Sequence, residues 1–328
     1  MDLPIVGKVQ DLVQKRVTNE KKSLYARRSR SFIGNLFYYL LLFSLSFVFL
    51  YPLLYMISQS LMRPSDVADA TIQWIPKQFE LNNYVEAFKA INYWNGLMNS
   101  IWISLGSAIL QIISCSFIGY GFARYKFPLK GLWLALVVFT FLVPPTTIVV
   151  PLYIFYSDLG WIDTLFPFIF PSAMGFGLKG ALFVLIFMQF YRGLPKVMEE
   201  AARIDGAGAF RTYWTIMFPL AKPAMVVVFL FSVVWHWNDV FQPNMYLLLP
   251  EFFNLAQNLA TFNGNANAEG LDQVARQVAQ GEAIGFAPTL MNQIMAAVML
   301  TILPILILYL FVQRAFVQGI ERSGIAGE

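Results

Sequence analysis

One histidine and one aspartate lie a helical turn apart in an otherwise apolar stretch of the sequence. His236 and Asp239 are flanked by Trp235, Trp237 and Asn238. Ionisable side chains in apolar spans usually face a cavity or each other. These five residues are therefore candidates to line a substrate pathway. A second interpretation stays open, in which Asn238 and Asp239 end the helix and the tryptophans form an interfacial belt.

The sequence offers no catalytic constellation besides this pair. His236 is the only histidine, and the only cysteine, Cys115, lies in an apolar run, so we expect neither a metal site nor a disulfide. An enzyme would gather His, Asp, Glu or Cys at one face, and this chain does not. It also lacks the phosphate-binding pattern GxxxxGK(S/T), so we expect it to bind no cofactor and not to hydrolyse ATP by itself.

The composition is that of an integral membrane protein. Hydrophobic residues make up 58% of the chain and charged residues 13%, whereas soluble domains average roughly 45–50% and about 25%. The net charge of +4 could suggest nucleic acid as a partner. The basic residues lie between the apolar segments, however, where a topology rule explains them, so we expect no nucleic acid.

Apolar segments long enough to cross a bilayer occur six times. About 20 residues of helix cross the roughly 30 Å of hydrocarbon, and only helices satisfy their own backbone polar groups there. The sequence therefore predicts an all-α membrane protein with six transmembrane helices. They are expected at residues 32–58, 98–122, 129–155, 167–190, 223–241 and 291–312.

The basic residues predict the orientation. If the N-terminus is cytoplasmic, all but five of the 23 lysines and arginines lie on the cytoplasmic side, as the positive-inside rule requires. Both termini are then cytoplasmic. The five exceptions are Arg63, Lys77, Lys89, Lys179 and Arg276, of which Lys179 follows a Pro- and Gly-rich stretch and can extend outward to the interface.

A polar, helix-forming stretch separates the fourth and fifth apolar segments. Ala202, Gly206 and Ala209 recur at i, i+4 and i+7, which gives a helix face without large side chains that another protein could approach closely. Glu199 and Arg203 are expected to pair one turn apart on another face. The stretch is therefore predicted to dock onto a cytoplasmic partner, and an ordinary helical turn between spans is the alternative.

Several motifs give the chain a family resemblance. From the first span to the C-terminus it resembles the inner-membrane permease subunits of carbohydrate ABC importers of the maltose type. The strongest motif is EAARIDGAG followed by IMFPLAKPA. Others occur in the expected order: NYVEAF, LMNSIWIS, YGFARYKFPLKG, VPPTTIVVPLYIFYSDLGWIDT and WHWNDVF.

The resemblance implies a coupling role for residues 191–222, the coupling segment. Its helix would seat in a cleft of an ATPase subunit, so that ATP-driven closure of the ATPase dimer rocks the spans between inward-open and outward-open states. The docking residues implied are Glu200, Ala201, Ala202 and Gly206, supported by Asp205 and Ala207. The implied partners are two ATPase subunits that bind ATP and Mg²⁺, a second permease, an extracytoplasmic solute-binding protein and a carbohydrate, in a bacterial inner membrane.

The expected organisation is a leader at 1–31, a six-helix domain at 32–313 and a cytoplasmic tail at 314–328. The leader is expected to lie as an amphipathic helix on the anionic inner leaflet, or to be solvated and disordered. An outer insertion at 265–286 is expected to hold a short amphipathic helix with Leu271, Val274, Ala275 and Val278 on its apolar face. That helix could contact the binding protein or pack on a permease.

A secondary transporter or channel is the remaining alternative of a different class. Such a protein would use a similar number of spans. It should also show paired carboxylates within the membrane, or an inverted repeat with broken helices, and the sequence shows neither pattern.

Overall fold

The computed structural model describes residues 34–68, 74–280 and 289–322, and within these ranges every regular element is a helix. The chain forms two compact units, Met1–Ser58 and Gln59–Glu328. The first unit consists, where it is described, of most of the helix Gly34–Ser60, which is apolar and 27 residues long. Its large apolar side chains are exposed, as expected for a helix surrounded by lipid. The leader at 1–31 lies outside the described residues.

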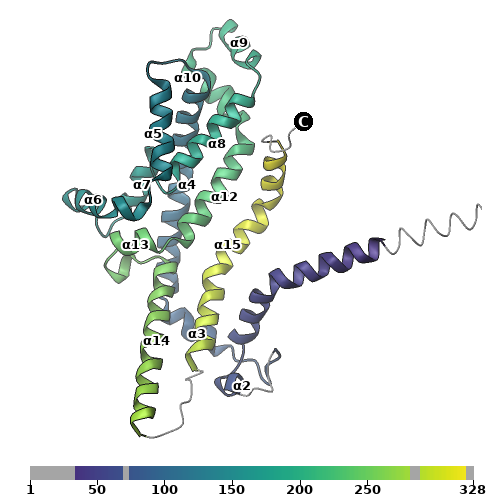
Figure 1. Ribbon diagram of the computed structural model, residues 1–328, viewed down its shortest axis with the longest axis vertical. Helices are drawn as coiled ribbons and strands as arrows, with labels where there is room; N and C mark the ends of the chain where they lie inside the picture. Colours follow the sequence, from purple (N-terminus) through teal and green to yellow (C-terminus); the bar gives the residue numbers. More distant parts are fainter. Residues whose placement is uncertain (1–33, 69–73, 281–288, 323–328) are drawn as a thin grey trace, which may run out of the picture. The chain divides into compact units, whose positions relative to one another are not determined.

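The second unit is built from helices of very different lengths (Figure 1). In chain order they are α2 Pro64–Ala68, α3 Asn82–Ala90, α4 Tyr93–Arg124, α5 Lys130–Leu142, α6 Pro145–Asp158, α7 Phe166–Ala173, α8 Gly180–Gly193, α9 Val197–Ile204, α10 Ala209–Thr212, the π-helix η1 Tyr213–Met217, α11 Phe218–Leu220, α12 Lys222–Asn238, α13 Phe241–Tyr246, the 3₁₀-helix η2 Pro250–Phe252, α14 Leu255–Gln280 and α15 Thr289–Arg322.

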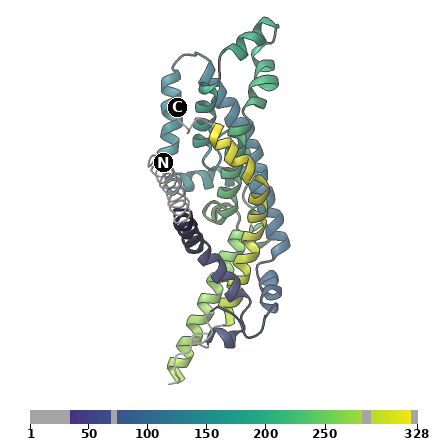
Figure 2. The same cartoon turned by 90° about the vertical axis from the view of Figure 1, so that its right-hand side faces the viewer.

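Helix α4 is the centre of this unit, because it packs against α7, α8, α12 and α14, while α12 also packs against α15. Gly119 permits the close contact with α8. A Cβ atom there would lie 2.8 Å from Phe187 Cβ and 2.9 Å from Val184 O, so any side chain would push α8 away. Both views place α9 and α10 at one end of the unit and α14 at the other (Figures 1 and 2).

The all-α membrane fold predicted from the sequence is confirmed, with a change in how the spans are built. By length and composition, three helices of the described chain can cross a bilayer alone: Gly34–Ser60, Tyr93–Arg124 and Met291–Val317. Three bent helix pairs bring the number to as many as six if each pair is one span. One of these pairs joins α10–α11 to α12 with a bend of 73° at the fifth predicted span.

The prediction that the third span is one continuous helix over 129–155 is wrong. Helices α5 and α6 meet at 98°. The cause is two adjacent prolines, since Pro144 forces Val143 into an extended conformation (ψ 123°) and Pro145 does the same to Pro144 (ψ 134°). Helix α5 alone has 13 residues, too few to cross the hydrocarbon.

The fourth span, predicted over 167–190, is also interrupted. Helix α7 ends at Ala173 and α8 begins at Gly180. Between them Gly175 and Lys179 adopt left-handed conformations, with φ of 75° and 60°. The carbonyl of Pro171 accepts the N–H groups of Phe176 and Gly177, so the helix is closed by a turn here instead of continuing.

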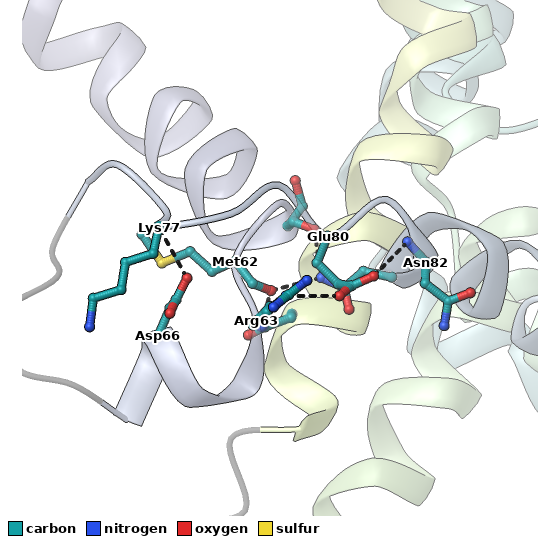
Figure 3. Close-up of polar contacts among 9 residues, drawn as sticks. Met62, Arg63, Asp66, Lys77, Glu80 and Asn82 are labelled. Atoms are coloured by element: carbon teal, nitrogen blue, oxygen red, sulfur yellow. Dashed lines mark hydrogen bonds and ion pairs between the residues drawn. The ribbon is translucent and has the colours of Figure 1, made fainter.

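The segment before α3 is held by polar contacts that the sequence did not reveal (Figure 3). Arg63 Nε lies 3.2 Å from Glu80 Oε2, and the Lys77 backbone N–H donates to Asp66 Oδ2 at 3.2 Å. Met62 is fully buried, and its carbonyl accepts hydrogen bonds from the side-chain amides of Asn83 and Asn292, the latter on α15. This loop is therefore fixed to α3 and α15.

The two predicted boundaries near the C-terminus fall within helices. Residues 265–280 of the outer insertion belong to the last part of the 26-residue helix α14, so a separate short helix after a flexible FNGNANAEG stretch is wrong. Each asparagine or glycine destabilises a helix by about 1 kcal/mol or less relative to alanine. The neighbouring turns of α14 can offset this cost. Residues 281–286 lie outside the described part. Helix α15 passes through Arg314 to Arg322 without a break at residue 313.

Candidate functional site

The coupling segment forms a helix, an elbow and a second short helix. Glu199 and Glu200 lie in the first turn of α9, where carboxylates favour the positive helix end. The helix ends at Ile204, and Gly206 follows two residues later with a φ of 77°, the left-handed conformation that glycine adopts without strain. The Ala207 N–H donates to Ala202 O at 2.9 Å, and the Gly206 N–H donates to Arg203 O at 3.0 Å. This is how a helix closes its last carbonyls.

The predicted docking residues do not all lie on one side of α9. Glu200, Ala201, Asp205 and Gly206 are exposed, and Ala207 is half-buried. Ala202, by contrast, is buried within the chain itself. No heavy atom lies within 4 Å of where a Cβ of Gly206 would be. The face open to a partner is thus formed by Glu200, Ala201, Asp205 and Gly206, without Ala202.

A row of apolar side chains completes the open face and was missed from the sequence. Val197 and Ile204 expose 68% and 86% of their surfaces, and with Ala201 they recur at i, i+4 and i+7. Phe210 on α10 is 67% exposed. The sequence also contains this spacing. The row of small residues Ala202, Gly206 and Ala209 is equally regular, however, and predicts a docking face of its own. Largely exposed apolar side chains gathered on a polar segment are typical of surfaces that contact another protein.

The opposite face of α9 is held by an ion pair with the end of α4. Glu199 Oε1 lies 2.9 Å from Arg124 Nε, and the two side chains are only 10% and 6% exposed. Arg124 Nη2 also donates to Leu194 O at 2.6 Å. The predicted Glu199–Arg203 pair is therefore wrong, because Glu199 turns inward to Arg124 and Arg203 is exposed. A partner 75 residues away in the sequence could not be read from helix spacing.

The far end of the segment is also attached to α4. Tyr213 begins the π-helix η1, and its hydroxyl donates to Ser116 Oγ at 3.1 Å. Ser116 Oγ is in turn 2.7 Å from the hydroxyl of Tyr191 on α8. All three side chains are buried. One serine of α4 thus joins α8, which leads into the coupling segment, to η1 near the far end of that segment.

The candidate pathway residues at the end of α12 have contacts of several kinds. Trp237 is buried, and its Nε1–H donates to Thr301 O on α15 at 3.1 Å. Asp239 Oδ1 accepts the Phe241 N–H at 2.9 Å where α13 begins. Asn238 is exposed and donates to Val234 O at 2.8 Å. These contacts hold the helix end in place.

Trp235 lies in an aromatic stack. Its ring is stacked on those of Phe183 and Phe231, with centroids 5.6 Å and 5.4 Å away. Lys179 Nζ lies 5.8 Å from the centroid of the same ring, within cation–π range. The lysine at the interruption between α7 and α8 therefore contacts the indole of α12.

His236 belongs to a buried polar chain and lines a cavity. Its Nδ1 lies 2.8 Å from Ser232 O, Ser232 Oγ donates to Gln111 Oε1 at 2.6 Å, and Gln111 Nε2 donates to Leu178 O at 2.9 Å. The cavity has a volume of about 910 Å³ and is lined by residues of α4 to α8, α12 and α13, including His236, with Lys179 from the turn between α7 and α8. No group of three or more potential metal ligands occurs in the described chain.

Residues 115–322 match the family model for the binding-protein-dependent transport system inner membrane component. The chain belongs to this family. The match covers the interrupted spans, the coupling segment and the end of α12. The broken helices therefore do not indicate a secondary transporter, and the chain is a permease subunit of an ATP-driven importer.

Curated relatives carry the match over most of the chain. The arabinooligosaccharides transport system permease protein AraQ of Halalkalibacterium halodurans is 28% identical over 86% of this chain and 93% of its own. The melibiose/raffinose/stachyose import permease protein MelC of Bacillus subtilis is 31% identical over 79% of this chain and 86% of its own. The sn-glycerol-3-phosphate transport system permease protein UgpE of Yersinia pestis is 28% identical over 70% of this chain and 72% of its own.

A solved structure agrees in fold. The crystal structure of a bacterial ABC transporter involved in the import of the acidic polysaccharide alginate contains a chain that matches with a TM-score of 0.70. The match covers 87% of this chain and 96% of that chain at 21% identity. At this identity the likeness concerns the fold, and it supports the helix arrangement of the second unit.

Proposed function

We propose that this permease imports an oligosaccharide or another carbohydrate and couples its passage to ATP hydrolysis by separate subunits. The supporting observation is the similarity to AraQ and MelC, whose names give oligosaccharide substrates, over most of both chains. The partners are a companion permease, two ATPase subunits that bind ATP and Mg²⁺, and an extracytoplasmic solute-binding protein. This chain contributes no catalytic residue.

Uptake by the reconstituted importer tests this function. Proteoliposomes that hold both permeases and the ATPase, supplied with ATP and the binding protein, should accumulate a labelled arabinose- or galactose-containing oligosaccharide. Omission of this permease should abolish accumulation. Uptake of glycerol 3-phosphate in preference to every oligosaccharide offered would contradict the carbohydrate assignment.

The open face of α9 supports a role as the ATPase contact. Glu200, Ala201, Asp205 and Gly206 give it a polar and sterically open part, and Val197 and Ile204 give it an apolar part. An interface needs a desolvated apolar centre with a polar rim, and this face offers both. Ala202 contributes from beneath, since its small side chain packs within the chain and allows α9 to lie close to its support.

The pathway proposal for Trp235 to Asp239 rests on His236. Of the five residues, His236 lines the 910 Å³ cavity, and its ring is held by the chain through Ser232 and Gln111. The other four make the helix-end and aromatic contacts described above and would act by fixing this wall of the cavity. A pathway for a sugar needs such polar groups at fixed positions.

The proposed orientation places both termini and the coupling segment in the cytoplasm. Cysteines introduced beside Arg124, Arg192 and Arg314 should then resist a membrane-impermeant thiol reagent in intact cells, whereas a cysteine at the exposed Asn82 should react. The native Cys115 is buried and should add little background. The reverse labelling pattern would overturn the orientation.

A further inference from the structure

Arg124 is the last residue of α4, and it contacts the coupling segment at two points. Its Nε lies 2.9 Å from Glu199 Oε1, an ion pair without hydrogen-bond geometry, and its Nη2 donates to the carbonyl of Leu194, in the turn between α8 and α9. Both charged side chains are almost completely buried. An ion pair shielded from water in this way is costly to break, because separation leaves a buried charge without its partner.

The covalent connections of α9 are poorly suited to transmit a movement. The helix bends by 77° from α8, and the turn that joins them includes Leu194. On its other side lies the elbow at Gly206, a residue with no neighbours within 4 Å of its Cβ position. A displacement of α9 that rotates the chain about these joints is not transmitted along the backbone. A side-chain contact that crosses to another helix avoids both joints.

The helix at the other end of this contact reaches the whole unit. Helix α4 is 32 residues long and packs against α7, α8, α12 and α14. A movement delivered at Arg124 therefore passes to the helices that border the cavity. Glu200, the neighbouring carboxylate, is exposed and has a different environment from Glu199.

We propose that Glu199 is a positioning residue that fixes α9 to α4 through Arg124, so that movement of α9 by the ATPase reaches the transmembrane helices. The proposal rests on the proposed function. Glu200 and Ile204 face the partner, whereas Glu199 faces the chain itself. Loss of the Glu199 charge should therefore uncouple ATP hydrolysis from substrate import without releasing the ATPase.

The test is Glu199→Gln in the importer reconstituted with all its subunits. The variant keeps the shape of the side chain and removes its charge. Its complex should retain the ATPase and hydrolyse ATP, while the number of oligosaccharide molecules imported per ATP hydrolysed falls at least about tenfold. Glu86→Gln is the matched control, because it makes the same chemical change at a carboxylate of α3 that is 42% exposed and lies 3.2 Å from Lys89 Nζ, and it should leave this ratio within about twofold of the wild-type value.

The outcomes separate the coupling role from folding and from the proposed function. A wild-type ratio for Glu199→Gln would overturn the coupling role. If that variant fails to assemble, Glu199→Asp, which keeps the charge on a shorter side chain, should assemble with a reduced ratio, and a wild-type ratio there would overturn it as well. Failure of the wild-type importer to take up any oligosaccharide would contradict the proposed function instead.

Discussion

Replacement of Gly206 by leucine should lower uptake at least about tenfold while the permease still inserts into the membrane. Two effects combine. Gly206 has a φ of 77°, and a residue with a Cβ in this conformation costs about 1–2 kcal/mol. The added side chain would also project from the open face of α9 and keep the ATPase at a distance. Since about 1.4 kcal/mol is a factor of ten, either effect alone is measurable.

The neighbouring glycine provides the control for this prediction. Gly208 is also exposed, with no heavy atom within 4 Å of its Cβ position, but its φ is −69°. Gly208→Ala should therefore retain wild-type uptake, and Gly206→Ala should fall between wild type and Gly206→Leu. Amounts of permease in the membrane, ATPase retained on purification and uptake are measured together. Wild-type uptake by Gly206→Leu would show that the elbow takes no part in coupling.

Features that depend on residues close in the sequence could be predicted. The six apolar segments, the coupling helix between the fourth and fifth, and the end of that helix near Gly206 follow from composition and from the conformational freedom of glycine. The break at Val143 could also have been predicted, because two successive prolines exclude a helix there. It was missed because the apolar segment that contains the two prolines is long enough to cross the bilayer as one helix.

Features that depend on distant residues could not be predicted. The partner of Glu199 is Arg124, at the end of a helix five elements earlier, and helix spacing offered Arg203 as a simpler choice. The same holds for Trp237, whose indole donates to a carbonyl of α15, and for Ala202, which turned out to be buried. In each case, tertiary packing determines which side of the helix is buried against the rest of the chain. The coupling segment carries two regularly spaced rows of residues, and a single sequence does not say which row is buried.

Replacement of Ile204 by aspartate should release the ATPase and leave the fold of the permease intact. Ile204 is 86% exposed, so its side chain contributes little to packing within the chain. Among the large apolar side chains on the open face of α9, it is the most exposed, so the proposed complex would bury it against the ATPase. The few residues that dominate an interface lie near its buried centre and contribute about 2 kcal/mol or more each, and we expect Ile204 to be one of them. The affinity for the ATPase should therefore fall by a factor of about 30.

The same substitution at a distant position separates docking from a general effect of the new charge. Ile75 is 80% exposed and lies in the segment before α3, on the side proposed to be extracytoplasmic. Ile75→Asp should retain the ATPase on purification, whereas Ile204→Asp should lose it, with equal amounts of both permeases in the membrane. Retention of the ATPase by both variants would exclude Ile204 from the contact. Loss in both would show that an added carboxylate, and not its position on α9, disturbs assembly. Only the selective loss follows from the exposed row Val197, Ala201 and Ile204, because this row lies opposite the face that Glu199 fixes to α4.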